Sequence, residues 1–333
     1  MRRVAFILGL LIVLALVGVG ATFVWGYAQY VRPGPIQSNV VVVVPQGTGL
    51  VGIAEELERK GVITDALVFV YGARIERKDK ALRAGEFLFR AHISPRDVVD
   101  LLVNGETVVR RLTIPEGLTT AQILARLETV EGLEGKIERW PGEGMLLPET
   151  YHFSYDASRE AMVERMAKAM QKTLHELWVH RRPDIPIKSM REALILASIV
   201  EKETALAEER GRVAAVFVNR LRKGMKLQSD PTVAYGLAVG TKPLGRALTR
   251  ADLKSDTPFN TYVIKGLPPG PICNPGRAAL EAVLNPGETK EYYFVADGSG
   301  GHVFARTLKE HNTNVAKWRK IERQRRANAK PAN

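Results

Sequence analysis

The first long stretch of the chain is almost entirely apolar. Residues Val4 to Trp25 carry no charged side chain, and Arg2 and Arg3 precede them. The stretch supplies the roughly 20 residues of a membrane-spanning helix and exceeds the roughly 7 to 15 apolar residues of a secretory signal. We therefore expect a retained membrane anchor, with a cleaved signal peptide as the alternative because Gly18 to Ala21 offers small residues. The leading arginines predict a cytoplasmic N-terminus and an extracytoplasmic remainder.

The pattern that follows is typical of a small folded module. The β-branched run Val40 to Val44 ends at Pro45 and predicts a strand, and Leu50, Ile53, Ala54 and Leu57 then recur at helical spacing. Residues 84–89 predict a second strand, and residues 94–103 predict a helix that begins at Ser94 and Pro95. We expect a compact βααβ-like module over about residues 38–105, either a carbohydrate-binding module or a structural subdomain.

Helices dominate the second half of the chain. Residues 109–114 predict a strand, and Thr119 or Thr120 is a candidate N-cap for the helix that follows. Between residues 162 and 179, Met and Leu side chains recur every four positions, which is typical of a core-facing helix. Residues 190–205 are apolar on nearly all sides and predict a buried helix, and residues 211–223 predict another. The whole pattern indicates an α+β fold.

The buried helix carries two glutamates near its C-terminal end. Projected at about 100° per residue, Glu203 continues the apolar stripe of Leu196 and Ile199, whereas Glu201 faces the opposite side with Ala197. A carboxyl that continues such a stripe is expected to be desolvated, which raises its pKa toward the range of a general acid. Glu203 is therefore the candidate catalytic residue, and a solvated or salt-bridged Glu203 is the structural alternative.

Net charge and composition limit the kinds of partner, cofactor and catalytic residue that we expect. The chain has 333 residues, 25% of them charged, and a net charge of +12, which predicts an anionic partner such as a phospholipid or an acidic wall polymer. An extracytoplasmic location disfavours nucleic acid. The single cysteine, Cys273, excludes an intramolecular disulfide and multi-cysteine metal sites, and the six histidines show no metal-ligand spacing, so we expect no metal or cofactor. Cys273 could act as a nucleophile with His302 or His311, but a packed thiol is the favoured interpretation.

Amide, hydroxyl and aromatic side chains gather in turns after this helix. The stretches Leu227 to Gly236, Asn260 to Tyr262 and Gly266 to Ile272 are suited to recognising a polyhydroxylated ligand through hydrogen bonds and stacking. The aromatic and acidic stretch Gly144 to Phe153 fits a sugar site or a core strand equally well.

Several long motifs together resemble a known family. The strings Leu196 to Ala205, Val216 to Leu221, Leu227 to Val233 and Phe294 to Gly298 closely resemble the YceG-like family of endolytic murein transglycosylases, in the same order. The resemblance implies a single-pass anchor, a small LysM-like α/β module and a mixed α+β catalytic domain. The expected boundaries are an anchor at 1–27, a linker at 28–37, the module at 38–107, the catalytic domain at 108–318 and a basic, disordered tail at 319–333.

The resemblance also implies a set of site residues. The family's catalytic glutamate lies in the Glu-Lys-Glu-Thr motif and maps onto Glu203, the residue that the helical projection selects; Glu201 is the fallback. Substrate-binding candidates are Glu149, Tyr151, Asn219, Gln228, Ser229, Asp230, Thr232, Tyr235, Asn260 and Tyr262.

The implied reaction uses one carboxyl twice on nascent glycan strands. Glu203 would protonate the β-1,4 bond between N-acetylmuramic acid and N-acetylglucosamine, then accept the proton of the muramic acid C6 hydroxyl as the 1,6-anhydro ring closes. The expected outcome is termination of strand elongation at the inner membrane, with peptidoglycan synthases as possible partners. A non-catalytic murein-binding scaffold and a hydrolytic muramidase remain the alternatives.

Overall fold

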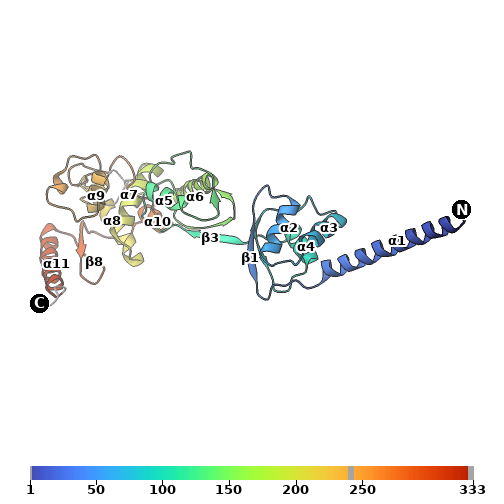
Figure 1. The fold of residues 1–333 in the computed structure, drawn as a ribbon. Coiled ribbons are helices and arrows are strands. Elements are labelled where there is room, and N and C mark those ends of the chain that lie inside the picture. Colours follow the sequence, from blue (N-terminus) through green and yellow to red (C-terminus); the bar gives the residue numbers. More distant parts are fainter. Residues whose placement is uncertain (1, 239–243, 329–333) are drawn as a thin grey trace. The chain divides into compact units, whose positions relative to one another are not determined.

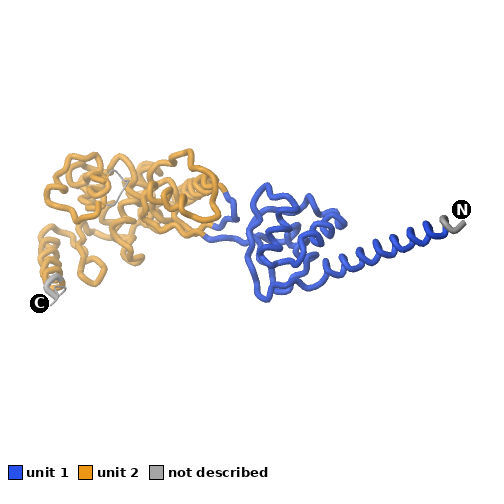
Figure 2. Tube along the Cα trace, viewed as in Figure 1, with its two compact units in different colours: residues 1–111, 152–157 blue, residues 112–151, 158–333 orange. Residues whose placement is uncertain are grey.

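The chain divides into two compact units. The structure, a computed structural model, describes residues 2–238 and 244–328. Unit 1 comprises residues 1–111 and 152–157, and unit 2 comprises residues 112–151 and 158–333 (Figure 2). The architecture is mixed α+β, as the sequence predicts (Figure 1). The short segment 152–157 packs with unit 1, although the sequence analysis assigned it to the catalytic domain.

The elements of each unit follow in chain order. Unit 1 contains α1 (Arg2–Val31), β1 (Val40–Val44), α2 (Leu50–Arg59), α3 (Ala66–Ile75), β2 (Gly85–Phe89) and α4 (Pro95–Asn104). Unit 2 contains α5 (Thr120–Glu128), β4 (Leu133–Glu134), α6 (Arg159–Val179), α7 (Met190–Glu203), α8 (Ala207–Arg222), α9 (Asp230–Ala238), the 3-10 helix η1 (Asp252–Lys254), α10 (Arg277–Leu284), β7 (Tyr293–Ala296), β8 (His302–Ala305) and α11 (Leu308–Asn328). Three further strands include residues of both units: β3 (Val109–Thr113) pairs with β5 (Thr150–Ser154), and β6 (Ala157–Ser158) pairs with β4.

Unit 1 has the strand–helix–helix–strand order that its sequence predicts. Strands β1 and β2 are antiparallel, with Val42 opposite Phe87, and Val42 and Val44 point into the core while Val41 is exposed. Helix α4 begins at Ser94, whose hydroxyl accepts from the backbone N–H of Asp97. These elements form because the N-cap of α4 and the alternation of buried and exposed side chains along β1 are both compatible with the packing of the core.

Helix α1 is longer than the predicted anchor. Residues Phe6–Val31 form the one helix, among the described residues, that is long and apolar enough to cross a membrane. The helix runs on to Val31, so the first residues of the expected linker are helical. The reason is tertiary: Tyr30 is only 3% exposed and packs in the core of unit 1.

The core of unit 2 is built around α7. Every residue from Ala193 to Val200 is buried, against side chains of α6, α8 and α10. Ser189 caps the start of the helix by accepting from the backbone N–H of Glu192. The methionines of α6 are buried in the core, as their spacing predicts. A helix that is buried on all sides is held rigidly, so the side chain of its last residue has a fixed position.

The basic C-terminal region is helical, whereas we expect disorder there from the sequence. Helix α11 continues to Asn328, and only residues 329–333 lie outside the described residues. Trp318 and Ile321 lie against Gly298 in the turn between β7 and β8, where a Cβ would come within 3.1 Å of Ile321. The structure thus gives residues 319–328 as part of α11, and two apolar side chains of this basic helix pack on the β7–β8 hairpin.

Candidate active site

Glu203 is the last residue of α7. Thr204 leaves the helix in an extended conformation, at φ −143° and ψ 133°, while its N–H still donates to the carbonyl of Val200. Glu203 thus stands, half-buried, where the buried helix reaches the polar loops of unit 2. The partial negative charge of a helix C-terminus disfavours a carboxylate at this position.

A hydroxyl group fixes the Glu203 carboxyl. The Oγ of Ser229 donates to Glu203 Oε1 at 2.5 Å, and Ser229 itself is 1% exposed. Its N–H donates to Oγ1 of Thr261, and its carbonyl accepts from Oγ1 of Thr232. Gln228, just before it, has φ 51°, a left-handed conformation that is uncommon outside glycine. The backbone turn at residue 228 and the two threonines therefore set the direction of the serine hydroxyl.

The environment raises the pKa of the Glu203 carboxyl to near neutral pH. Burial raises its pKa from 4.5 to about 7, because an ionised carboxylate loses hydration there. The hydrogen bond from Ser229 lowers the pKa, and the negative charge of Asp230 raises it again. A carboxyl with a pKa near 7 can both donate and accept a proton at neutral pH.

Electrostatic interactions with Arg220 and His302 lower the pKa of the same carboxyl. Arg220 on α8 is 7% exposed, and its guanidinium donates to the carbonyls of Tyr292 at 2.6 Å and Leu227 at 2.5 Å. His302 on β8 places Nδ1 2.8 Å from Oε2 of Glu209, and the backbone N–H of His302 donates to the same carboxylate. The pKa of Glu203 is therefore set by two opposing effects: desolvation raises it, and nearby positive charge lowers it.

Asp230 and Tyr262 complete the group around Glu203. The hydroxyl of Tyr262 donates to Oδ1 of Asp230 at 2.6 Å. Burial raises the pKa of Tyr262, and the charges of Asp230 and Glu203 raise it further. Four of the predicted site residues, Glu203, Ser229, Asp230 and Tyr262, thus lie within electrostatic reach of one another.

Two predicted substrate-binding residues are fully buried. Thr232 and Asn260 are both 0% exposed. Thr232 bonds within the Ser229 loop, and the amide of Asn260 donates to the carbonyls of Leu253 and Ser255. Both polar groups satisfy buried backbone and hold the loops that carry Ser229 and Tyr262, and their part in substrate binding stays a prediction.

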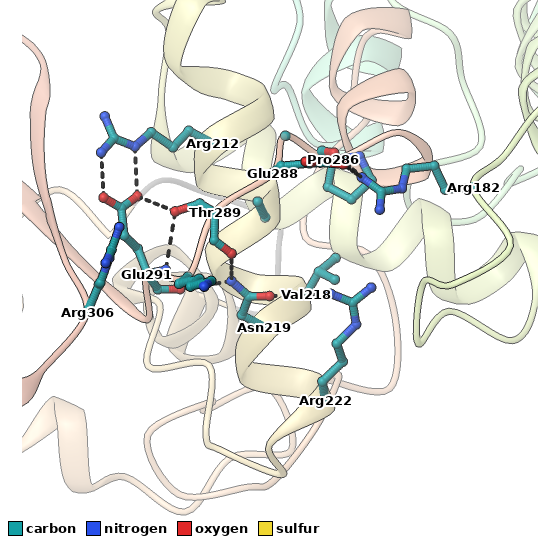
Figure 3. Close-up of a pocket in the computed structure, with 13 residues that line it drawn as sticks. Arg182, Arg212, Val218, Asn219, Arg222, Pro286, Glu288, Thr289, Glu291 and Arg306 are labelled. Atoms are coloured by element: carbon teal, nitrogen blue, oxygen red, sulfur yellow. Dashed lines mark hydrogen bonds and ion pairs between the residues drawn. The ribbon is translucent and has the colours of Figure 1, made fainter.

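Four further predicted residues make their contacts elsewhere in unit 2. Tyr151 is 4% exposed and its hydroxyl donates to the carbonyl of Leu147, while Glu149 is exposed. The ring of Tyr235 packs on Phe259, and its hydroxyl donates to Glu143. Asn219 donates to the carbonyls of residues 289 and 291 (Figure 3). No contact joins these residues to Glu203 among the side-chain contacts that the structure describes, so their part in substrate binding stays a prediction.

Glu201 faces a different segment from Glu203, as the helical projection predicts. Its Oε2 accepts from the backbone N–H of Gly276, which precedes α10, at 2.9 Å. Burial raises its pKa, and the charge of Glu116 raises it as well. The carboxylate therefore ties α7 to the start of α10, a structural role that does not require substrate.

Cys273 packs in the core of unit 2. It is 0% exposed, and its thiol donates to the carbonyl of Ser198 at 3.3 Å. Burial raises the pKa of the thiol well above its usual value, which disfavours the reactive thiolate. Neither His302 nor His311 contacts it in the described part of the chain, so the favoured sequence interpretation, a packed thiol, agrees with the structure.

A separate cavity of about 620 Å³ lies beside α8 (Figure 3). Arginines line it, but carboxylates pair with three of them: Arg212 with Glu291, and Arg182 and Arg222 with Asp184. None of the residues grouped around Glu203 lines this cavity. The Arg212–Glu291 pair holds the end of the 286–291 segment, and the next residue, Tyr292, carries the carbonyl that Arg220 binds.

Sequence reasoning missed some residues around the site. Arg220 was not singled out as a site residue, and His302 was considered only as a partner of Cys273. Glu209 was not singled out, and no feature of the sequence could have paired it with a histidine 93 positions away. Glu143, which binds Tyr235, was missed for the same reason.

Together these contacts define a class of site. A half-buried, protonatable carboxyl lies at the end of a rigid helix, a serine hydroxyl orients it, and polar loops surround it. Such an arrangement suits general acid–base chemistry on a polar ligand.

Comparisons with known proteins show which relatives the chain has. The endolytic murein transglycosylase of Streptococcus pneumoniae serotype 2 (strain D39 / NCTC 7466) is 31% identical over 94% of this chain and 65% of its own length. The chain therefore spans just under two thirds of that relative. The endolytic murein transglycosylase of Bacillus subtilis (strain 168) is 31% identical over 85% of both chains.

A solved structure and a family model agree with these relatives. The crystal structure of the YceG-like protein lmo1499 from Listeria monocytogenes matches with a TM-score of 0.51 and 32% identity, covering 83% of this chain and 99% of that one. The model of the YceG-like family matches residues 42–317. The chain belongs to the YceG-like family.

Proposed function

We propose that the chain is a lytic transglycosylase that cleaves peptidoglycan glycan strands endolytically, with Glu203 as its catalytic residue. The observation that carries the proposal is the Glu203 carboxyl, with its pKa raised to about 7 and its Oε1 held by Ser229. Membership of a family whose curated relatives are named endolytic murein transglycosylases supports the substrate class.

The proposed reaction begins with proton donation. Protonated Glu203 gives its proton to the oxygen of the β-1,4 bond between N-acetylmuramic acid and N-acetylglucosamine. That bond breaks, the N-acetylglucosamine side leaves as an alcohol, and an oxocarbenium-like centre develops at C1 of the muramic acid. The Asp230 carboxylate lies close enough to influence the charge on Glu203, so it is placed to stabilise that positive charge.

The same carboxyl then acts as a base. Ionised Glu203 accepts the proton of the muramic acid C6 hydroxyl while the C6 oxygen bonds to C1, which yields a 1,6-anhydro ring and restores protonated Glu203. No water is consumed. A pKa near 7 suits this double role, because neither protonation state is strongly disfavoured at neutral pH. Ordinary glycosidases instead divide the work between two carboxyl groups.

The remaining parts of the chain fit a location at the membrane. We propose that α1 anchors the chain in the inner membrane with its N-terminus in the cytoplasm, following the arginines that precede it. We propose that residues 38–107 form a LysM-like module, which the βααβ order of unit 1 supports. Cleavage of nascent strands next to the membrane would end their elongation, and peptidoglycan synthases are the partners that such a role implies.

The test is product analysis with matched variants. Full-length chain in detergent is incubated with un-crosslinked nascent glycan, and the products are analysed by mass spectrometry for the wild type, Glu203→Gln and Glu201→Gln. We expect anhydromuramic ends from the wild type and from Glu201→Gln, and none from Glu203→Gln. Glu201→Gln is the matched control because it makes the same change two residues away on the other helix face.

The other outcomes select the alternatives. Reducing ends in place of anhydro ends would make the chain a hydrolytic muramidase, since water and not the C6 hydroxyl would then have attacked C1. Binding of glycan without any cleavage by the wild type would make it a scaffold. Loss of activity in Glu201→Gln alone would refute the assignment of Glu203.

A further inference from the structure

Helix α3 carries an apolar stripe on its outer face. Leu67, Tyr71 and Ile75 are spaced four residues apart and are 66%, 59% and 64% exposed. Side chains at this spacing lie on one face of a helix. The opposite face, which includes Phe69 and Ala73, is buried in the core of unit 1. A helix that is apolar on both faces is unusual at a surface that meets only water.

The stripe lies beside α1. The ring of Tyr30 on α1 covers Gly72 of α3 so closely that a Cβ at residue 72 would lie 2.2 Å from Cε2 of Tyr30. This contact, together with the burial of Tyr30, fixes α3 against the end of α1 within unit 1. The absence of a side chain at Gly72 is what permits the two helices to approach.

A groove of about 540 Å³ separates the rest of the two helices. Val19, Phe23 and Tyr27 of α1 line one side, and Leu67, Tyr71 and Ile75 of α3 line the other. We call it the α1–α3 groove. Its two acidic residues are already engaged: Asp65 caps α3 by accepting from the N–H groups of residues 67 and 68, and Glu76 pairs with Lys78 and Arg96. The groove therefore presents apolar side chains and no uncompensated carboxylate.

The length of α1 sets the depth of this groove in a bilayer. At about 1.5 Å per residue, a hydrocarbon core of about 30 Å takes about 20 residues. The apolar part of α1 has 26 residues, Phe6–Val31, so a core that begins at Phe6 ends near Trp25. Val19 and Phe23 then lie within the hydrocarbon, and Tyr27 lies in the interface where aromatic side chains concentrate. Leu67, Tyr71 and Ile75 line the same groove, so they lie beside the part of α1 that crosses from the hydrocarbon into the interface.

We propose that the outer face of α3 is a membrane-contact surface: Leu67, Tyr71 and Ile75 insert at the boundary between headgroups and acyl chains of the bilayer that α1 spans, and lipid chains fill the α1–α3 groove. The continuity of the stripe with the exposed apolar surface of α1 identifies lipid as the occupant. Unit 1 is thereby held on the membrane surface. The inference rests on α1 as the anchor and is independent of the catalytic activity.

Site-specific fluorescence in a bilayer tests this directly. Full-length chain carrying Cys273→Ala and Tyr71→Cys is labelled with an environment-sensitive fluorophore and reconstituted into liposomes with and without lipids that carry a quencher near the headgroup end of the acyl chain. The matched control is Val41→Cys: Val41 on β1 is also an exposed apolar side chain, at 46%, but does not line the groove. Leu67→Cys is a second probe of the stripe if the label at residue 71 perturbs folding.

We expect lipid quenching at residue 71 or 67 at least twofold stronger than at residue 41, and the reverse order for a water-soluble quencher. Equal quenching at stripe and control positions would overturn the proposal, since the stripe would then be in water. Self-quenching of the label that increases with the protein-to-lipid ratio, without quenching by lipid, would also overturn it, because a second copy of the chain would then cover the face.

Discussion

Ionisation of Glu203 should make the stability of unit 2 depend on pH. The folded pKa of about 7 lies above the ordinary value of 4.5, so folding favours the protonated carboxyl. The stabilising contribution is therefore fully present below about pH 4.5 and is lost as the pH rises through about 7. Each pH unit between the two pKa values corresponds to about 1.4 kcal/mol, which gives a total of about 3 kcal/mol.

The variant Glu203→Gln isolates this contribution. Gln keeps an oxygen that accepts the Ser229 hydroxyl but carries no charge, so it lacks the penalty that ionisation imposes on the wild type at high pH. We expect the free energy of unfolding of Glu203→Gln, relative to the wild type, to increase by about 2 to 3 kcal/mol between pH 5 and pH 8.5.

Urea unfolding in detergent, followed by tryptophan fluorescence, measures the difference. Trp140, Trp178 and Trp318 all belong to unit 2, so the fluorescence reports mainly on the unit that contains Glu203. The control is Glu164→Gln, the same change on the exposed face of α6, for which we expect a difference that stays constant with pH. A Glu203→Gln difference that is equally constant, within about 0.5 kcal/mol, would refute the argument that Glu203 is desolvated.

Three further changes test the surroundings of the site. Ser229→Ala removes a hydrogen bond that orients Glu203 and lowers its pKa, so the cleavage rate should fall about tenfold and its alkaline limb should move to higher pH in a pH–rate profile; an unchanged profile would count against the contact. Arg220→Lys loses the forked donors to two backbone carbonyls and should destabilise unit 2 by about 2 to 3 kcal/mol in urea unfolding, whereas unchanged stability would contradict that role. Cys273→Ala should retain wild-type cleavage, and the native thiol should resist alkylation until the chain unfolds; rapid labelling of the folded chain would show that the burial is wrong.

Local features of the fold were accessible from the sequence. Ser94, and either Thr119 or Thr120, were predicted as caps, and Ser94 and Thr119 do cap α4 and α5. Such caps can be predicted because a cap involves residues only two or three positions apart. The Val40 to Val44 strand and the methionine stripe of α6 follow from side-chain periodicity alone. The limits of α1 and the helix at residues 319–328 were not predicted, because Tyr30, Trp318 and Ile321 are held by distant segments of the chain.

The turn residues illustrate why polar composition is an ambiguous guide to a binding site. Ser229, Thr232, Asn260 and Tyr262 look alike in sequence as hydroxyl and amide groups on loops. Packing separates them: Ser229 and Tyr262 direct their hydroxyls to carboxyl groups of the site, while Thr232 and Asn260 are fully buried and bind backbone. Buried loops need such groups for their own hydrogen bonds, so only the fold distinguishes support from contact.

Helix periodicity in the sequence is enough to show that Glu203 continues the apolar stripe of a buried helix and that Glu201 does not, because helix geometry alone decides which residues share a face. It could not determine what surrounds the carboxyl. Ser229 comes from a loop 26 residues further on, and His302 comes from β8, where Glu209 of α8 holds it. Only the tertiary structure brings a hydroxyl, an arginine, a histidine and a second carboxylate to the end of α7. The combined effect of these groups and of desolvation brings the pKa of Glu203 to about 7.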